Sequence, residues 1–145
     1  MISFSKKLFY AIEAVLYIAY NATTEPMSSK EIAARQGMPP RYLEQMMQRL
    51  VRAGVLRGVR GPHGGYLLAK EKRRITLADI SGALGDEETE PQSTPLGNQI
   101  VLPVIRKCQS SIAQQMQETT IAELYEQANA RHIRKAAGER NDFTI

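Results

Sequence analysis

The sequence predicts a mainly α-helical fold with one small β-hairpin wing, arranged as a winged helix-turn-helix followed by a long dimerisation helix. Three observations carry this prediction. Apolar residues of the first half recur at the three-to-four spacing of amphipathic helices. Two short apolar runs flank a turn rich in glycine and proline, which indicates a hairpin. A further helical stretch with a continuous apolar stripe occupies the last third of the chain.

Composition and charge restrict the class of protein. The chain has 145 residues, of which 43% are hydrophobic and 23% charged, as in an ordinary single-domain globular protein. No apolar run reaches the roughly 18 residues of a membrane span, and the first residues lack the pattern of a signal peptide. The single cysteine cannot form an internal disulfide, which fits a reducing compartment. We therefore expect a cytoplasmic protein without membrane association.

Positive charge is concentrated in the first part of the chain. Residues 1–85 contain 13 Lys and Arg against 6 Asp and Glu, whereas residues 86–145 contain 6 against 9. A basic half beside an acidic half suggests that the first half meets a polyanion. A merely solvated basic surface would give the same charge balance, so the motifs have to decide.

The first two helices have clear ends. The first is expected over residues 5–21, before Pro26, which disfavours helical geometry in the residue preceding it. The second begins after Ser28, which can cap it, with Glu31 three residues later at the capping-box position. Gly37 stands where a left-handed residue would end this helix.

The third helix follows after a tight turn, which completes the plan of a helix-turn-helix. Pro40 suits its first position and Gly54 closes it. Its apolar residues share one face. The polar residues on the opposite face are Arg41, Glu44, Gln45, Gln48 and Arg52.

A β-hairpin is expected next, from two apolar runs at residues 55–59 and 66–69. A hairpin directly after a helix-turn-helix is a wing. Thr76 then caps a fourth helix that ends near Gly85.

The second half is expected to contain a long helix, which starts near Pro103 and runs toward Glu118, and a last helix that opens with a Thr120–Glu123 capping box. The stretch before the long helix is acidic and almost free of apolar residues, which is typical of a mobile loop. The chain thus divides into a winged helix-turn-helix domain (1–85), a mobile acidic loop (86–97), a helical dimerisation arm (98–137) and a frayed tail (138–145).

The long helix carries an apolar stripe whose spacing is close to that of a coiled-coil seam, which is typical of a helix that packs against another helix. Cys108 lies on this stripe, where packing is the ordinary role of a cysteine. A redox or ligand-sensing role is the alternative. The expected dimerisation residues are Val101, Val104, Ile105, Cys108, Ile112 and Met116.

The exposed face of the third helix has the chemistry for reading double-stranded DNA, although a solvated amphipathic helix would show a similar pattern. Arg41 suits guanine, Gln45 suits adenine and Glu44 suits cytosine. We expect these three to specify bases, whereas Arg49 and Arg52 hold phosphates. The helical residues expected at the DNA are Ser28, Lys30, Arg41, Tyr42, Glu44, Gln45, Gln48, Arg49 and Arg52.

The wing supplies the remaining expected DNA contacts. Arg60 precedes glycines that permit a close backbone approach, and an arginine at a hairpin tip suits a narrow minor groove. His63 has two interpretations, a phosphate contact or a turn residue without a role. The expected wing residues are Arg60, Gly61, His63 and Gly64.

Nothing in the sequence indicates an enzyme, a metal site or a cofactor. His63 and His132 are far apart and belong to no ligand pattern. The glycines at 61–65 lie between two strands rather than before a helix, so they are no nucleotide-binding loop. No nucleophile elbow or paired acid–base set is present in the sequence.

Several motifs together resemble the IscR, NsrR and CymR type of winged-helix regulators, the Rrf family. They are VRGPHGGYLLA (59–69), YLEQ (42–45), LVRAGVL (50–56), ITLADI (75–80) and TTIAEL (119–124), so the likeness extends to about residue 128. The resemblance implies a homodimer on a palindromic operator, with Arg60 in the minor groove and Glu44 and Gln45 on the base-reading face.

The chain departs from this family in three places. His63 replaces a glycine that is usual in the wing, and the pair Pro39–Pro40 stands where the family often has a serine cap. Many relatives bind an iron–sulfur cluster through three cysteines before the long helix, but residues 86–102 contain none and Cys108 does not match that triplet. The chain therefore resembles a cluster-free branch, controlled by an effector protein, a small molecule or oxidation.

Two other functions stay open beside the leading one, a DNA-binding repressor or dual regulator. The chain could be an interaction module for a metabolic enzyme, with little affinity for DNA. Cys108 could also form a thiol switch across the dimer seam.

Overall fold

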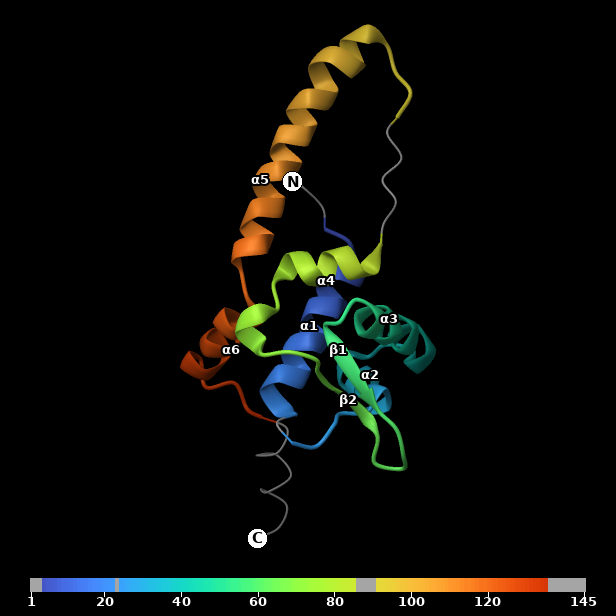
Figure 1. Cartoon of the computed structure of the whole chain (residues 1–145), viewed down its shortest axis with the longest axis vertical. Helices are drawn as coiled ribbons and strands as arrows, with labels where there is room; N and C mark the ends of the chain where they lie inside the picture. Colours follow the sequence, from blue (N-terminus) through green and yellow to red (C-terminus); the bar gives the residue numbers. More distant parts are fainter. Residues whose placement is uncertain (1–3, 23, 86–90, 136–145) are drawn as a thin grey trace.

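The computed structural model describes residues 4–22, 24–85 and 91–135 and confirms the expected fold class. A body of short helices carries a two-stranded hairpin on one side, and a long helix rises out of the body (Figure 1). The elements are α1 (Lys6–Asn21), α2 (Ser29–Gln36), α3 (Pro40–Arg52), β1 (Leu56–Val59), β2 (Gly65–Leu68), the 3-10 turn η1 (Lys72–Arg74), α4 (Leu77–Leu84), the π-helical turn η2 (Gly97–Val101), α5 (Leu102–Glu118) and α6 (Ile121–Ala130).

The core is built around α1, which lies in the middle of the body (Figure 1). Its small residues Ala11 and Ala14 are fully buried, which lets neighbouring elements approach its backbone closely. Helices α2, α3, α4 and α6 and the hairpin all contribute side chains to the same core. The large residues that are buried almost completely are Val15, Ile18, Ile32, Leu43, Met47, Leu50, Val55, Leu56, Ile75, Ile80 and Ile121.

The capping residues act where the sequence predicts them. The Ser28 hydroxyl accepts a hydrogen bond from the Glu31 backbone N–H at 3.1 Å, and Gly37 ends α2 in the left-handed conformation with φ 67°. Pro40 is the first residue of α3. Thr76 and Asp79 form a complete capping box at the start of α4. These local signals fix the lengths of the short helices because they satisfy end groups that have no partner within the helix.

The end of α3 is a Schellman motif centred on Gly54, with φ 77°. The Gly54 N–H donates to the Val51 carbonyl and the Val55 N–H to the Leu50 carbonyl, both at 3.0 Å. This turn leads directly into β1, which pairs antiparallel with β2. Leu56 lies opposite Leu68 and Val59 opposite Gly65, so the hairpin starts at the expected place.

The long helix α5 begins at Leu102 and ends at Glu118, as expected. Helical conformation also precedes it, from Pro95 through η2, which was not expected. Pro103 has no N–H to donate, and the chain before it widens so that the Leu102 N–H reaches back five residues to the Gly97 carbonyl. Residues 95–97, expected to belong to the loop, are therefore helical.

The last helix returns to the body, which differs from its expected place in the arm. The Leu77 N–H donates to the Thr119 carbonyl at 3.0 Å and the Ile121 N–H donates to the Ile75 carbonyl at 2.9 Å. In α6, Tyr125 packs edge-to-face on Tyr20 of α1, with ring centroids 5.3 Å apart. Among the described residues the projecting arm is therefore α5 with η2. Residues 86–90 of the expected loop and the expected tail, 138–145, lie outside the described residues.

Candidate nucleic-acid interface

Helix α3 has one buried face and one exposed polar face. The exposed fraction of Leu43, Met47 and Leu50 is zero, so this side is fixed against the core. The opposite side points to solvent and has no core contacts to make. The exposed polar residues of this side are the five of the predicted reading face, Arg41, Glu44, Gln45, Gln48 and Arg52.

The start of α2 lies beside the wing. Ser28, which caps α2, is half-buried, and Lys30 in the first turn is exposed. Tyr42, in the first turn of α3, has 44% of its surface exposed. The unpaired N–H groups at a helix start favour anions and the exposed Lys30 adds a positive charge, whereas Glu31 in the same turn of α2 opposes both.

The wing is fixed to the chain before α2 by backbone hydrogen bonds. The Met27 N–H donates to the Tyr66 carbonyl at 3.1 Å, and the Tyr66 N–H donates to the Met27 carbonyl at 2.8 Å. A Cβ on Gly65 would lie 2.3 Å from the Met27 carbonyl oxygen, closer than any side chain permits. Glycine at this position therefore lets the wing backbone dock against the helix-turn-helix.

The wing tip is a tight turn built on Gly61 and Gly64. The Gly64 N–H donates to the Gly61 carbonyl at 3.0 Å, and Gly61 has φ 119°, which L side chains rarely adopt. A Cβ on Gly64 would lie 2.3 Å from the Val59 carbonyl oxygen. The turn leaves Arg60 exposed at the end of β1.

One cleft joins the wing to the two helices of the helix-turn-helix. It has a volume of about 480 Å³ and brings Arg60 to the same side of the molecule as the start of α2 and the end of α3. Burial raises the pKa of Tyr66, and the negative charge of Glu44 raises it further, so Glu44 acts electrostatically on the wing. The cleft is lined by Ser28, Ser29, Val51, Gly58, Val59, Arg60, Gly64, Gly65 and Tyr66.

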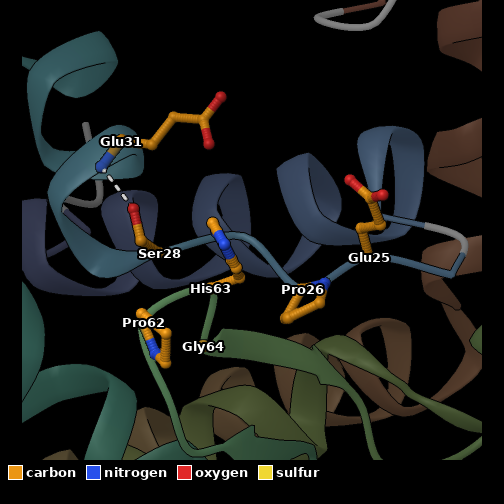
Figure 2. Close-up of a pocket in the computed structure, with 7 residues that line it drawn as sticks. All are labelled: Glu25, Pro26, Ser28, Glu31, Pro62, His63 and Gly64. Atoms are coloured by element: carbon orange, nitrogen blue, oxygen red, sulfur yellow. Dashed lines mark hydrogen bonds between the residues drawn. The ribbon is translucent and has the colours of Figure 1, made fainter.

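A second hollow lies at the wing tip, where His63 and Pro62 face the chain that leads into α2 (Figure 2). Its volume is about 530 Å³, and the carboxylates of Glu25 and Glu31 also line it. Two carboxylates disfavour a phosphate in this hollow. His63 is exposed at the tip.

Arg49 is exposed, and it also has a hydrogen-bond partner within the protein. Its Nη1 donates a hydrogen bond to the carbonyl oxygen of Leu84, the last residue of α4. A carbonyl at a helix C-terminus has no partner within the helix and carries partial negative charge, so it attracts the guanidinium. Arg52, three residues further along α3, is exposed as well.

The expected dimerisation stripe follows α5 and is open to solvent along much of its length. Val101, Val104 and Ile105 have 53%, 58% and 48% of their surfaces exposed. Cys108 is also exposed, whereas Ile112 and Met116, nearer the body, are partly buried.

The residues present do not form a metal site in the part of the chain that the structure describes. No group of three His, Cys, Asp or Glu side chains comes together there. His63 belongs to the wing and His132 follows α6. No helix among the described residues is long and apolar enough to cross a membrane.

Two functional positions were missed in the sequence analysis, Met27 and Gly65. Their role is to attach the wing through backbone atoms, which side-chain chemistry does not reveal. The available signal was the second glycine of the pair at 64–65, because a glycine inside a strand often marks a close backbone approach.

The chain belongs to the Rrf2 family. The model of this family, described as an iron-dependent transcriptional regulator, matches residues 4–127. A helix-turn-helix followed by a hairpin wing is thus the DNA-binding architecture of a bacterial transcriptional regulator family, and the motif-based resemblance to IscR and CymR is confirmed at this level.

Individual relatives give the same picture. The chain is 33% identical over 145 residues to a protein of Synechocystis sp. named as a candidate HTH-type transcriptional regulator, covering 96% of this chain and 97% of that one. It is 40% identical over 77 residues to the regulator IscR of Klebsiella pneumoniae, which is 53% of this chain and 47% of IscR.

Solved structures extend the similarity to the whole fold. The structure of T. potens IscR superposes with a TM-score of 0.76 at 31% identity and covers 94% of this chain and 95% of that one. The structure of CymR, the global cysteine regulator of B. subtilis, superposes with a TM-score of 0.68 at 28% identity, covering 87% and 98%.

Proposed function

We propose that this protein is a sequence-specific regulator of transcription that binds a palindromic operator as a homodimer. Helix α3 enters the major groove and reads bases with Arg41, Glu44 and Gln45, while Arg60 of the wing enters the adjacent minor groove. The observation that carries the proposal is the cleft that joins Arg60 of the wing to the start of α2 and to Val51 at the end of α3, the helix that bears the exposed polar face. This cleft places the wing beside the recognition helix, as contact of both with one duplex requires.

The exposed apolar stripe of α5 supports the homodimer. Large apolar side chains that stay half-exposed on a projecting helix mark an interaction surface. A second copy of the same helix offers the matching stripe, and a two-fold axis then presents both copies of α3 to the DNA. In that dimer the two recognition helices lie about 34–36 Å apart, one turn of DNA, or a multiple of it.

The family description names iron, but the donor set of this chain does not fit an iron–sulfur cluster. Such clusters are held by several cysteine thiolates, and this chain has one cysteine. That cysteine, Cys108, is exposed on α5, and the described residues offer no three-ligand group around it. The proposed regulator therefore works without a cluster, and its effector is a protein, a small molecule or an oxidant.

Repression is the proposed direction of control. A dimer that covers about two turns of duplex competes with other proteins for the same DNA. In this proposal α3 and the wing supply the DNA-reading surface and α5 the dimerisation helix, which suffices for such competition.

Selection from a library of random DNA duplexes tests the proposal. The protein should enrich an inverted repeat, and its affinity for the selected duplex should fall steeply with rising salt. Arg41→Ala should relax the preference at one base pair by about 1–3 kcal/mol, as measured by fluorescence anisotropy. The matched control is Arg131→Ala, an exposed arginine at the end of α6.

Three results would contradict the proposal. If no sequence is enriched, the chain does not read DNA, and the interaction-module alternative gains support. Equal losses of Arg41→Ala on the selected duplex and on a scrambled duplex would remove Arg41 from the base-reading face. An equal effect of Arg131→Ala would show that net charge alone decides the affinity.

A further inference from the structure

The C-terminus of α4 is a junction between three elements of the body. The Leu84 carbonyl accepts a hydrogen bond from Arg49 of α3 and another, at 3.4 Å, from Nζ of Lys7 in α1. Gly85 follows in the left-handed conformation, with φ 61°, and turns the chain away from the helix. Two cations thus meet one carbonyl at the negative end of a helix dipole.

Arg49 is suited to hold α3 at a fixed angle to α4. Its guanidinium reaches out of the recognition helix, and the bond to Leu84 spans 35 residues of sequence. Hydrogen bonds from charged donors are the stronger ones, and their direction restricts how far one helix can rotate against the other. The apolar contacts between the two helices, by contrast, are not directional.

Helix α4 also packs against the dimer arm. It lies across the top of the body, in contact with α3 on one side and with the base of α5 on the other (Figure 1). Helix α4 is therefore the element that contacts both the arm and the recognition helix, and Arg49 supplies a directional bond between α4 and α3.

We propose that Arg49 is a positioning residue, which sets the angle of the recognition helix relative to the dimer arm through the Leu84 carbonyl. This inference rests on the proposed function, because the angle matters only if two copies of α3 must fit one operator. Arg49 then contributes to sequence specificity without touching DNA, and an effector that moves α5 changes operator affinity through this bond.

Measurements of DNA affinity distinguish this role of Arg49 from a phosphate contact. A phosphate contact is independent of sequence, so its loss lowers the affinity for all duplexes equally. It also reduces the slope of log affinity against log salt concentration by about one. Loss of a positioning residue misaligns the base-reading side chains, so it weakens the selected duplex and leaves scrambled DNA and the salt slope nearly unchanged.

The experiment compares Arg49→Met with Arg52→Met by fluorescence anisotropy on the selected and the scrambled duplex across a salt series. We expect Arg49→Met to lower the affinity for the selected duplex about tenfold, because roughly one charge-assisted hydrogen bond is lost. The affinity for scrambled DNA should not change. Arg49→Lys keeps a cationic donor and should recover most of this loss. Arg52→Met, the control for a phosphate contact, should weaken both duplexes equally and reduce the slope.

A double-mutant cycle tests the same link by displacing the acceptor, the Leu84 carbonyl. Gly85→Val places a β-branched residue at a positive φ and so displaces the end of α4, although Gly85 is no part of the DNA-reading surface. It should lower specificity like Arg49→Met, and the double variant should lose no more than either single variant. Circular dichroism and denaturant unfolding establish that each variant is folded. If Arg49→Met does not fold, Gly85→Val still tests the proposal, because it keeps the Arg49 side chain and displaces its acceptor.

The outcomes separate the two proposals. A wild-type protein that binds both duplexes equally would overturn the proposed function and this inference with it. This inference alone would be overturned if the wild type discriminates between the duplexes while Arg49→Met loses affinity for both equally and its salt slope falls by one. Additive losses in the cycle, or unchanged specificity in Gly85→Val, would also overturn it.

Discussion

Replacing Gly65 by alanine should detach the wing from the helix-turn-helix. The added Cβ would lie 2.3 Å from the Met27 carbonyl oxygen, 2.4 Å from its carbonyl carbon and 2.7 Å from the Ser28 nitrogen. All three are backbone atoms, so no side-chain rotation relieves the overlap. The two backbone segments must separate, and both hydrogen bonds between Met27 and Tyr66 are then lost.

The magnitude of the effect follows from those two bonds. Each net backbone hydrogen bond contributes about 0.5–1.5 kcal/mol, so their loss lowers the free energy of unfolding by about 1–3 kcal/mol. Because the wing also leaves its place beside α2, Arg60 no longer lines a cleft with the start of α2 and the end of α3. Affinity for the selected duplex should therefore fall together with stability.

Gly58 provides a matched control on the same hairpin. It pairs with Tyr66 across the ladder, and nothing lies within 4 Å of a Cβ built on it. Gly58→Ala should leave stability unchanged or raise it by up to about 1 kcal/mol, because alanine has less freedom in the unfolded chain. Only the steric environment differs between the two substitutions.

The assay is urea unfolding followed by circular dichroism, at one protein concentration because dimerisation would make apparent stability concentration-dependent. Anisotropy on the selected duplex follows in parallel. Equal stability of Gly65→Ala and Gly58→Ala would refute the argument, because the close approach at Gly65 would then be relieved without breaking the wing attachment.

Three further predictions concern the arm, the wing and the end of α6. Ile105→Glu places a charge on the half-exposed stripe of α5 and should give a folded monomer in sedimentation velocity; a persistent dimer would contradict the seam. Arg60→Ala should lower the affinity for the selected duplex and abolish the preference for A·T pairs beneath the wing. Duplexes with G·C replacements measure this preference, and an intact preference would exclude Arg60 from the minor groove. A hydrogen bond from Lys135 lowers the pKa of Tyr125, so stability should rise as the pH increases from the folded pKa toward 10.0, because the unfolded chain then binds more protons. Tyrosinate absorbance should show Tyr125 ionising before Tyr66, whose pKa is raised; an unchanged Tyr125 titration in Lys135→Met would contradict the stated cause.

The short helices and the hairpin could be predicted from the sequence because their ends are set by local chemistry. Ser28, Gly37 and Thr76 satisfy or terminate a helix within four residues of themselves, so their neighbours in sequence suffice to interpret them. The wing followed from apolar runs around a glycine turn, and the two faces of α3 followed from helical periodicity.

Features that depend on distant partners could not be predicted. The helical residues before the long helix were not predicted, because Pro103 looks like a first residue, whereas the chain already widens into η2 before it. Arg49 has the same side chain as any phosphate-binding arginine, and only the fold brings Leu84 beside it. The return of α6 to the body brings together residues far apart in sequence, such as Tyr20 and Tyr125, more than a hundred residues apart.

Hydroxyl-radical footprinting of the selected duplex tests the joint use of α3 and the wing most directly. The account predicts two protected half-sites on one side of the duplex, related by a dyad and centred about 10 base pairs or a multiple apart. It also predicts that Arg60→Ala restores cleavage at the sugars beside the wing and leaves the sugars that flank α3 protected. Protection of a single, unrepeated segment, or a pattern that Arg60→Ala does not alter, would contradict it.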